Sequence, residues 1–159
     1  MAEFVQAGER RIGKGKTVLS VLGLGSCIVV VLYDGEARIG GVAHILLPDP
    51  THSQHRQVPW RFATTAVPAL LAELEMAGAD RRRMTARIVG GAGMLRELAP
   101  PDGIRIGERN VAAARSALAR HGIEIVAEDV GGDNGRSLHF HLEDGRVRVA
   151  RHGKSHVEL

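Results

Sequence analysis

The sequence contains little of the material that disulfide frameworks and base-stacking surfaces require. It has one cysteine, one tryptophan, one tyrosine and three phenylalanines among 159 residues. A single unpaired cysteine fits a reducing compartment. With 3% aromatic residues and a formal charge of only +3, there are few rings to stack on bases and little charge to attract phosphates, so we expect no nucleic-acid partner.

Long hydrophobic runs are also absent. No apolar stretch approaches the length of about 20 residues that spans a bilayer, and residues 1–15 lack the apolar core of a signal peptide. We therefore expect a cytoplasmic protein without membrane insertion. A chain with 44% hydrophobic and 25% charged residues has an ordinary globular composition, and its length suits one domain, so we expect residues 1–159 to form a single domain.

The stretch over residues 22–48 holds the single cysteine, Cys27, and a histidine, His44, in otherwise apolar surroundings. It reads LGLGSCIVVVLYDGEARIGGVAHILLP. Two apolar runs separated by Asp34 and Gly35 predict two strands joined by a two-residue type I′ turn. This strand pair is the first candidate for a functional site.

A two-residue turn fixes the register of the pair. It places Tyr33 opposite Glu36 and, further along, Cys27 opposite Val42. Because side chains on one face of a strand recur every second residue, His44 then shares a face with Cys27, diagonal to it and about 7 Å away between Cα atoms. A thiol and an imidazole can meet across that distance. The register therefore predicts a Cys-His pair.

The turn before Cys27 supports the same interpretation. Gly25 and Ser26 belong to a glycine-flanked turn where another backbone can approach closely, and their exposed N–H groups are candidates for holding an oxyanion. The residues alone leave an alternative open. Cys27 can equally be a small buried hydrophobe, and His44 a hydrogen-bonded strand histidine.

Periodicity along the rest of the chain predicts the fold class. Apolar residues at helical spacing predict two main helices, and short apolar runs predict strands before, between and after them. The helices are expected over 60–76 and 109–121, and the strands over 17–22, 28–33, 37–46, 85–89, 123–128, 137–142 and 146–151. Pro68 is expected to kink the first helix or to mark its true start. This order indicates an α+β fold of layered mixed sheets flanked by the helices.

Two other patterns carry weaker signals. His52 and His55 lie in a polar loop, and His139 and His141 share a strand face, but neither pair has a third ligand at a suitable spacing. The glycines over 90–93 follow a strand without the Gly-Lys-Ser/Thr of a phosphate-binding loop. We therefore expect no metal and no cofactor, and we expect residues 90–93 to form a tight turn or a loop near the site.

Six motifs follow one another along residues 22–137: LGLGSCIVVVLYD, GGVAHILLP, AVPALLAELEMAGA, GGAGM, IGERNV and GGDNGRS. In this order they resemble the bacterial chemotaxis protein family CheD, the chemoreceptor glutamine deamidases, and the resemblance covers about residues 8–149. The resemblance implies a β-sandwich with helices outside, as in the catalytic domain of the cytotoxic necrotizing factors. It also implies a CheC-type phosphatase as partner.

The activity that the resemblance implies is a cysteine-dependent protein-glutamine amidohydrolase. In this family the cysteine of the Gly-Ser-Cys motif is the nucleophile and the histidine of the next strand is its base, which correspond to Cys27 and His44. The substrates would be glutamines of methyl-accepting chemotaxis receptors, converted to glutamate with release of ammonia through a thioester. No cofactor would take part.

The sequence departs from the family at one position. Many members carry a threonine six residues before the cysteine as a third catalytic residue, where this chain has Val21. Ser20 is adjacent, but a strand would point it to the opposite face. Three alternatives for orienting His44 stay open, which are Ser20 or Thr17 after a local bulge, or a backbone carbonyl. The missing threonine also leaves a competing function, a non-catalytic adaptor that binds a CheC-type phosphatase or a receptor.

Overall fold

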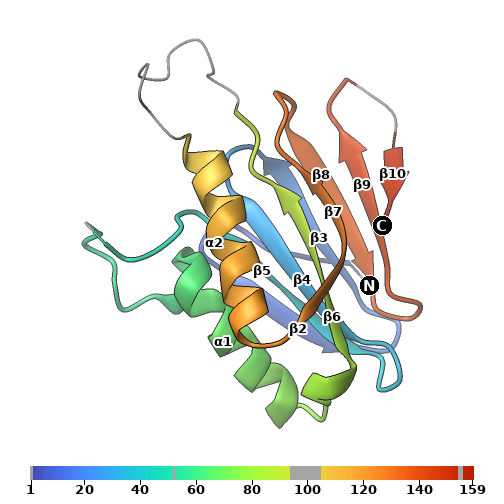
Figure 1. Ribbon diagram of the computed structural model, residues 1–159. Helices are drawn as coiled ribbons and strands as arrows, with labels where there is room; N and C mark the ends of the chain where they lie inside the picture. Colours follow the sequence, from blue (N-terminus) through green and yellow to red (C-terminus); the bar gives the residue numbers. More distant parts are fainter. Residues whose placement is uncertain (1, 52, 94–104, 154–155) are drawn as a thin grey trace.

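The computed structural model describes residues 2–51, 53–93, 105–153 and 156–159, which form two five-stranded mixed sheets and two α-helices (Figure 1). The first sheet has the strand order β1-β3-β8-β9-β10 and the second the order β2-β5-β4-β6-β7. The predicted α+β fold of layered sheets with two main helices is therefore confirmed.

The described elements have the following bounds: β1 Ala2–Phe4, β2 Arg10–Lys14, β3 Val18–Leu24, β4 Ile28–Asp34, β5 Ile39–Ile45, the 3-10 turn η1 Pro59–Arg61, α1 Ala63–Met76, the 3-10 turn η2 Arg81–Arg83, β6 Met84–Gly90, α2 Ile106–Arg120, β7 Glu124–Val130, β8 Arg136–His141, β9 Arg146–Arg151 and β10 His156–Glu158. No helix in this described part of the chain is long and apolar enough to cross a membrane.

Two apolar layers hold these elements together. The inner layer lies between the sheets and joins Val29 of β4 to Phe140 of β8. The outer layer lies between the second sheet and the helices and joins Ile28 of β4 to Leu70 of α1 and Leu118 of α2. Each such side chain contributes about 1.5–3 kcal/mol when fully buried. All seven residues of β4 and all seven residues of β5 are buried, because both strands lie between the two apolar layers and contribute side chains to each.

Two glycines of β5 allow the layers to approach closely. A Cβ on Gly40 would lie 2.9 Å from the Phe140 ring in the first sheet, and a Cβ on Gly41 would lie 3.2 Å from Leu70 of α1. Both distances are shorter than ordinary carbon contacts. The pair therefore sets the spacing between β5, the opposite sheet and the helix, at the strand that carries His44.

Three short strands and the position of one proline differ from the sequence prediction. β1, β2 and β10 were not predicted, since each has three to five residues and shows no clear alternation of buried and exposed side chains. Pro68 lies inside α1, five residues after its first residue. The expectation that it marks the start of the helix was wrong, because tertiary packing of the apolar face extends α1 back to Ala63.

The turn between β4 and β5 is longer than the predicted two residues. Asp34 pairs with Ile39, so residues 35–38 form a four-residue loop. The Asp34 carboxylate accepts hydrogen bonds from the N–H groups of Glu36 and Ala37 at 3.1 and 3.2 Å. This side chain thus keeps Asp34 in the strand and closes the turn beyond it, which is typical of an Asx turn.

The same carboxylate is also the anchor of the η2 segment. Asp34 is fully buried and accepts from Arg83 at 2.9 and 3.1 Å and from the backbone N–H of Asp80 at 2.9 Å. Burial alone would raise the pKa of Asp34, but the hydrogen bonds from Arg83, Asp80 and Ala37 outweigh it, and the pKa lies at about 2. The ionised form is thus stabilised in the folded state.

We expect this carboxylate to stabilise the fold by about 2 kcal/mol at neutral pH, relative to an unfolded pKa near 3.9. The contribution is complete above about pH 4 and is lost as the pH falls towards 2. Asp34→Asn should therefore lower the free energy of unfolding at pH 7 and flatten its decline below pH 4, measured by urea unfolding. Asp144→Asn, at the exposed turn between β8 and β9, is the matched control. An equal loss in both variants would contradict the role given to burial.

Candidate active site

Cys27 and His44 lie at the same end of the strands β4 and β5. Cys27 directly precedes β4, and Val29 of β4 pairs with His44 of β5. The predicted pairing of Cys27 with Val42 was wrong, because Val42 pairs with Val31. The longer loop displaces the register by four residues. An even displacement preserves which face each side chain occupies, so Cys27, two residues before Val29, stays diagonal to His44.

The predicted pairing of Tyr33 with Glu36 fails for the same reason, and Tyr33 lies opposite Gly40. The Tyr33 ring occupies the inner layer, where it meets Phe140 edge-on with ring centroids 5.4 Å apart. Its hydroxyl donates to the backbone carbonyl of Leu142 in the opposite sheet. The displaced register therefore changes which residues are paired along the whole of β4 and β5, but not which face each side chain occupies.

The candidate site lies where the chain crosses from one sheet to the other. β3 belongs to the first sheet and β4 to the second, and residues 25–27 join them. The Cys27 side chain is half-buried and packs against the inner apolar layer. His44 is 6% exposed. Both side chains thus sit at the end of the inner layer, with little solvent around the imidazole and partial access to the thiol.

His44 is held by a backbone carbonyl from the segment after β1. Its Nδ1 lies 3.3 Å from the carbonyl oxygen of Val5. A carbonyl only accepts, so Nδ1 carries the proton and Nε2 keeps its lone pair. Burial lowers the pKa of His44, and the bond to Val5 and the charge of Glu9 oppose that shift without cancelling it. The imidazole is therefore neutral near pH 7 and can act as a base through Nε2.

Three successive carbonyls of the crossing segment are hydrogen-bonded. Ala92 donates its N–H to the carbonyl of Gly25 at 3.0 Å, and Gly91 donates to the carbonyl of Cys27 at 2.9 Å. The carbonyl between them, of Ser26, accepts from a side chain of α2 at 3.0 Å. The sequence left two alternatives for residues 90–93, a tight turn or a loop near the site, and the hydrogen bonds of Gly91 and Ala92 to the segment before β4 favour the second.

The orientation of these carbonyls also fixes the N–H groups of the segment. The described peptide bonds are all trans, and the C=O and N–H of a trans peptide point in opposite directions. The N–H of Ser26 therefore points away from Ala92, and the N–H of Cys27 points away from α2. Burial raises the pKa of the Cys27 thiol, and its own backbone N–H lowers that pKa in part.

Ser20 and Val21 face opposite sides of β3. The Ser20 hydroxyl lies 2.7 Å from Nδ1 of His139, its neighbour on β8 in the first sheet. Val21 is fully buried in the inner layer. The irregularity of β3 lies between Val21 and Leu24, after Ser20, so it does not turn the serine towards the inner layer.

The remaining alternatives for orienting His44 are also placed by the structure. The Thr17 hydroxyl donates to the carbonyl of Lys14 at 3.0 Å, before β3 begins. The carbonyl of Val5 contacts Nδ1 of His44 directly. Of the three alternatives from the sequence, the geometry favours the backbone carbonyl.

Sequence reasoning missed two contributors to this region. Val5 contacts His44 through its backbone carbonyl, and a pattern of side chains in the sequence cannot predict a contact with a carbonyl. Asn110 of α2 is fully buried and bonds the carbonyl of Ser26. It lies on the apolar face of α2 with Ala114 and Leu118, and a polar residue in such a stripe was the signal that could have found it.

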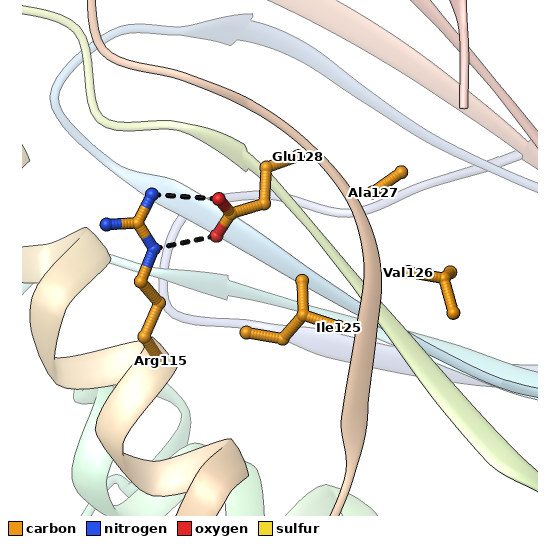
Figure 2. Close-up of a pocket in the computed structure, with 5 residues that line it drawn as sticks. All are labelled: Arg115, Ile125, Val126, Ala127 and Glu128. Atoms are coloured by element: carbon orange, nitrogen blue, oxygen red, sulfur yellow. Dashed lines mark hydrogen bonds and ion pairs between the residues drawn. The ribbon is translucent and has the colours of Figure 1, made fainter.

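A hollow of about 460 Å³ elsewhere on the surface lacks the chemistry of a catalytic site. It lies between α2 and the edge strand β7, lined by Ile125, Val126 and Ala127 (Figure 2). Arg115 and Glu128 cross it as a bidentate ion pair, with both hydrogen bonds at 2.8 Å. Each charge is neutralised by the other, and none of the five lining side chains is a nucleophile.

Metal binding has no support in the described residues. They bring together no group of three or more His, Cys, Asp or Glu side chains that could hold an ion. His52, which the sequence pairs with His55, lies outside the described residues. His139, which the sequence pairs with His141, bonds Ser20.

The chain matches known proteins along most of its length. The family model described as CheD chemotactic sensory transduction matches residues 46–151, which begin just after the strand that carries His44. A "Probable chemoreceptor glutamine deamidase CheD" of Symbiobacterium thermophilum is 44% identical over 159 residues, covering 99% of this chain and 96% of that protein. Proteins of the same name from Archaeoglobus fulgidus and Pyrococcus abyssi are 42% and 40% identical, each covering 92% of this chain and 90% of its own length.

Among solved structures, the Bacillus licheniformis hypothetical protein YfiH aligns with a TM-score of 0.46 and 15% identity, over 81% of this chain and 58% of that one. That likeness is too slight to support an argument. The family match and the near full-length identities are decisive by themselves, and the chain belongs to the CheD family.

Proposed function

We propose that this protein is a cysteine-dependent glutamine deamidase that acts on chemotaxis receptors. The observation that carries the proposal is the arrangement at the end of the inner layer. A half-buried thiol, Cys27, packs against the inner layer, and a neutral, buried imidazole, His44, shares its face. The names of the relatives supply the substrate class, a chemoreceptor glutamine.

The resting site holds a thiol and a neutral imidazole, so the proton moves during the attack. Nε2 of His44 takes the proton of Cys27 as the sulfur adds to the carboxamide carbon of the glutamine. The carbonyl oxygen becomes an oxyanion, held by the N–H groups of Cys27 and Ser26. Each such donor typically lowers the barrier by about 3–4 kcal/mol.

The second half of the reaction returns the site to its first state. The protonated His44 gives its proton to the departing nitrogen, which leaves as ammonia, and a thioester with Cys27 remains. His44 then takes a proton from water, the hydroxide adds to the thioester carbon, and the sulfur leaves and recovers the proton. The product is glutamate, and neither redox change nor cofactor enters this balance.

The substrate and partner follow from the family. Conversion of a receptor glutamine to glutamate adds one negative charge and makes a carboxylate that a methyltransferase can esterify, so both effects would alter signalling. A turn flanked by glycines suits a protein substrate, because a helix carrying the glutamine can approach the backbone closely. We also expect a CheC-type phosphatase to bind this chain in organisms that have one.

We expect Cys27→Ala and His44→Ala each to lower turnover at least about 1,000-fold, because each removes a group that handles the transferred proton or the acyl carbon. The measurement is mass spectrometry of receptor peptides after incubation with the purified protein. His139→Ala is the matched control, since it removes a strand histidine that bonds Ser20, and it should keep turnover. Turnover at the wild-type rate in Cys27→Ala, or no turnover in the wild-type protein, would contradict the deamidase function and leave the non-catalytic adaptor as the function.

The pH dependence of Cys27 alkylation distinguishes two resting states of the site. In one, the thiol is neutral and His44 acts as a general base; in the other, the two groups form a thiolate–imidazolium ion pair. Burial raises the pKa of the thiol, so we expect iodoacetamide labelling to rise with a midpoint above the value of about 8.5 for free cysteine. His44→Ala should leave that midpoint almost unchanged although it abolishes turnover. If the two groups instead formed a thiolate–imidazolium pair, Cys27 would be labelled well below pH 8.5, and His44→Ala would abolish this labelling at low pH.

The third member of the site is tested at β3. We expect Ser20→Ala to keep turnover within about twofold, because the Ser20 hydroxyl bonds His139 and not His44. Val21→Thr should leave turnover unchanged or raise it, while the buried hydroxyl lowers the free energy of unfolding by about 1–3 kcal/mol unless it bonds His44. Initial rates and urea unfolding measure both effects. A large loss of turnover in Ser20→Ala would assign the orienting role to the serine.

A further inference from the structure

Asn110 of α2 is the side chain that joins the two halves of the proposed site. It is fully buried, and its Nδ2 donates to the carbonyl of Ser26 at 3.0 Å and to the carbonyl of Leu46 at 2.9 Å. Ser26 directly precedes Cys27, and Leu46 follows His44 by two residues. One amide group therefore ties the turn that carries the thiol to the strand that carries the imidazole.

The orientation of this amide is set by its two partners. Both are carbonyl oxygens, which only accept, so the NH₂ end must face them and its two protons are both used. The other end, Oδ1, is buried and accepts no hydrogen bond from the described residues. Leaving a buried acceptor unpaired is unfavourable. The Asn110 side chain thus bonds two carbonyls at once although its own Oδ1 is unpaired among the described residues.

The hydrogen bond from Asn110 to the Ser26 carbonyl also fixes the N–H of Cys27. The Ser26 carbonyl and the Cys27 N–H belong to one planar peptide and point in opposite directions. Fixing the carbonyl towards α2 therefore fixes the direction of the Cys27 N–H, a group that lowers the pKa of the thiol in part. Gly91 and Ala92 hold the neighbouring carbonyls, but neither bonds the peptide that contains this N–H.

We propose that Asn110 is a positioning residue for the reaction at Cys27, which holds the oxyanion-binding N–H of Cys27 in place and in register with the strand of His44. The inference rests on the proposed deamidase function and adds a residue to it. Asn110 touches neither the substrate nor the reacting atoms. Its effect passes through the Ser26–Cys27 peptide and through the backbone at Leu46.

The test compares Asn110→Leu with Asp34→Asn, using receptor peptides as substrate. Asn110→Leu keeps the branched shape and the number of side-chain heavy atoms but has no donors. It should lower kcat about 100-fold with KM changed less than about twofold, because a misdirected oxyanion donor weakens only the transition state. Asp34→Asn weakens the far end of β4 without touching the site, and it should keep kcat within about twofold. Equal kcat in Asn110→Leu and wild type, or a loss that appears only in KM, would overturn the proposal.

A second measurement tests the positioning without any turnover. In Asn110→Leu the N–H of Cys27 is no longer fixed, so the pH midpoint of Cys27 alkylation should move upward. In Asp34→Asn this midpoint should stay unchanged. If the wild-type protein releases no ammonia, the proposed function fails while this shift still decides the positioning. An unshifted midpoint in a folded variant would overturn it.

Asn110→Ala serves where Asn110→Leu does not fold. The smaller side chain admits water, which can bond both carbonyls but does not fix their direction. This variant should show the same fall in kcat and the same upward shift of the alkylation midpoint. Wild-type values for both in a folded Asn110→Ala would overturn the proposal.

Discussion

The planarity of three successive peptides, at the point where the chain passes from the first sheet to the second, is the constraint on which the proposed site depends. Residues 25–27 make this crossing, and each of their carbonyls is bonded to the segment after β6 or to α2. The N–H group of each of these peptides must then point away from the partner of its carbonyl. In the proposed site, the bonds made to the carbonyls would thus set the direction of the backbone donors for an oxyanion.

The segment that holds those carbonyls is itself held. The carbonyl of Gly90 accepts from the N–H of Gly131, and Gly93 donates to Gly132, so the loops after β6 and β7 brace each other. Gly90 must be a glycine, since a Cβ there would collide with the carbonyl oxygen of Cys27. The buried Arg136 donates to the carbonyl of Gly131 at 2.7 Å. The positioning of the thiol therefore extends through several contacts into the ends of both sheets.

Burial gives the proposed thiol and base a common character. It raises the pKa of Cys27 and lowers the pKa of His44, so both groups rest in their neutral forms near pH 7. A neutral pair stores no charge in the apolar layer and develops charge only when a substrate carbonyl is present to accept it. In the proposed mechanism, the Val5 carbonyl would stabilise the imidazolium that then forms and keep Nε2 directed towards the reaction.

The sequence by itself determined the fold class and the central buried strand, because the spacing of apolar residues in helices and strands is local. It did not determine the register, since the Asp34 carboxylate closes a longer loop through the N–H groups of Glu36 and Ala37 and is itself held by Arg83, 49 residues away in the chain. Cys27 and His44 share a face because the register of the folded chain differs from the predicted one by an even number of residues. It suggested three ways to orient His44, and only the folded chain brings Val5 to the imidazole. Asn110 joins Ser26 to Leu46 across 84 and 64 residues. Contacts of this range exist only once α2 has packed on the second sheet, so tertiary structure alone decided which groups position the thiol.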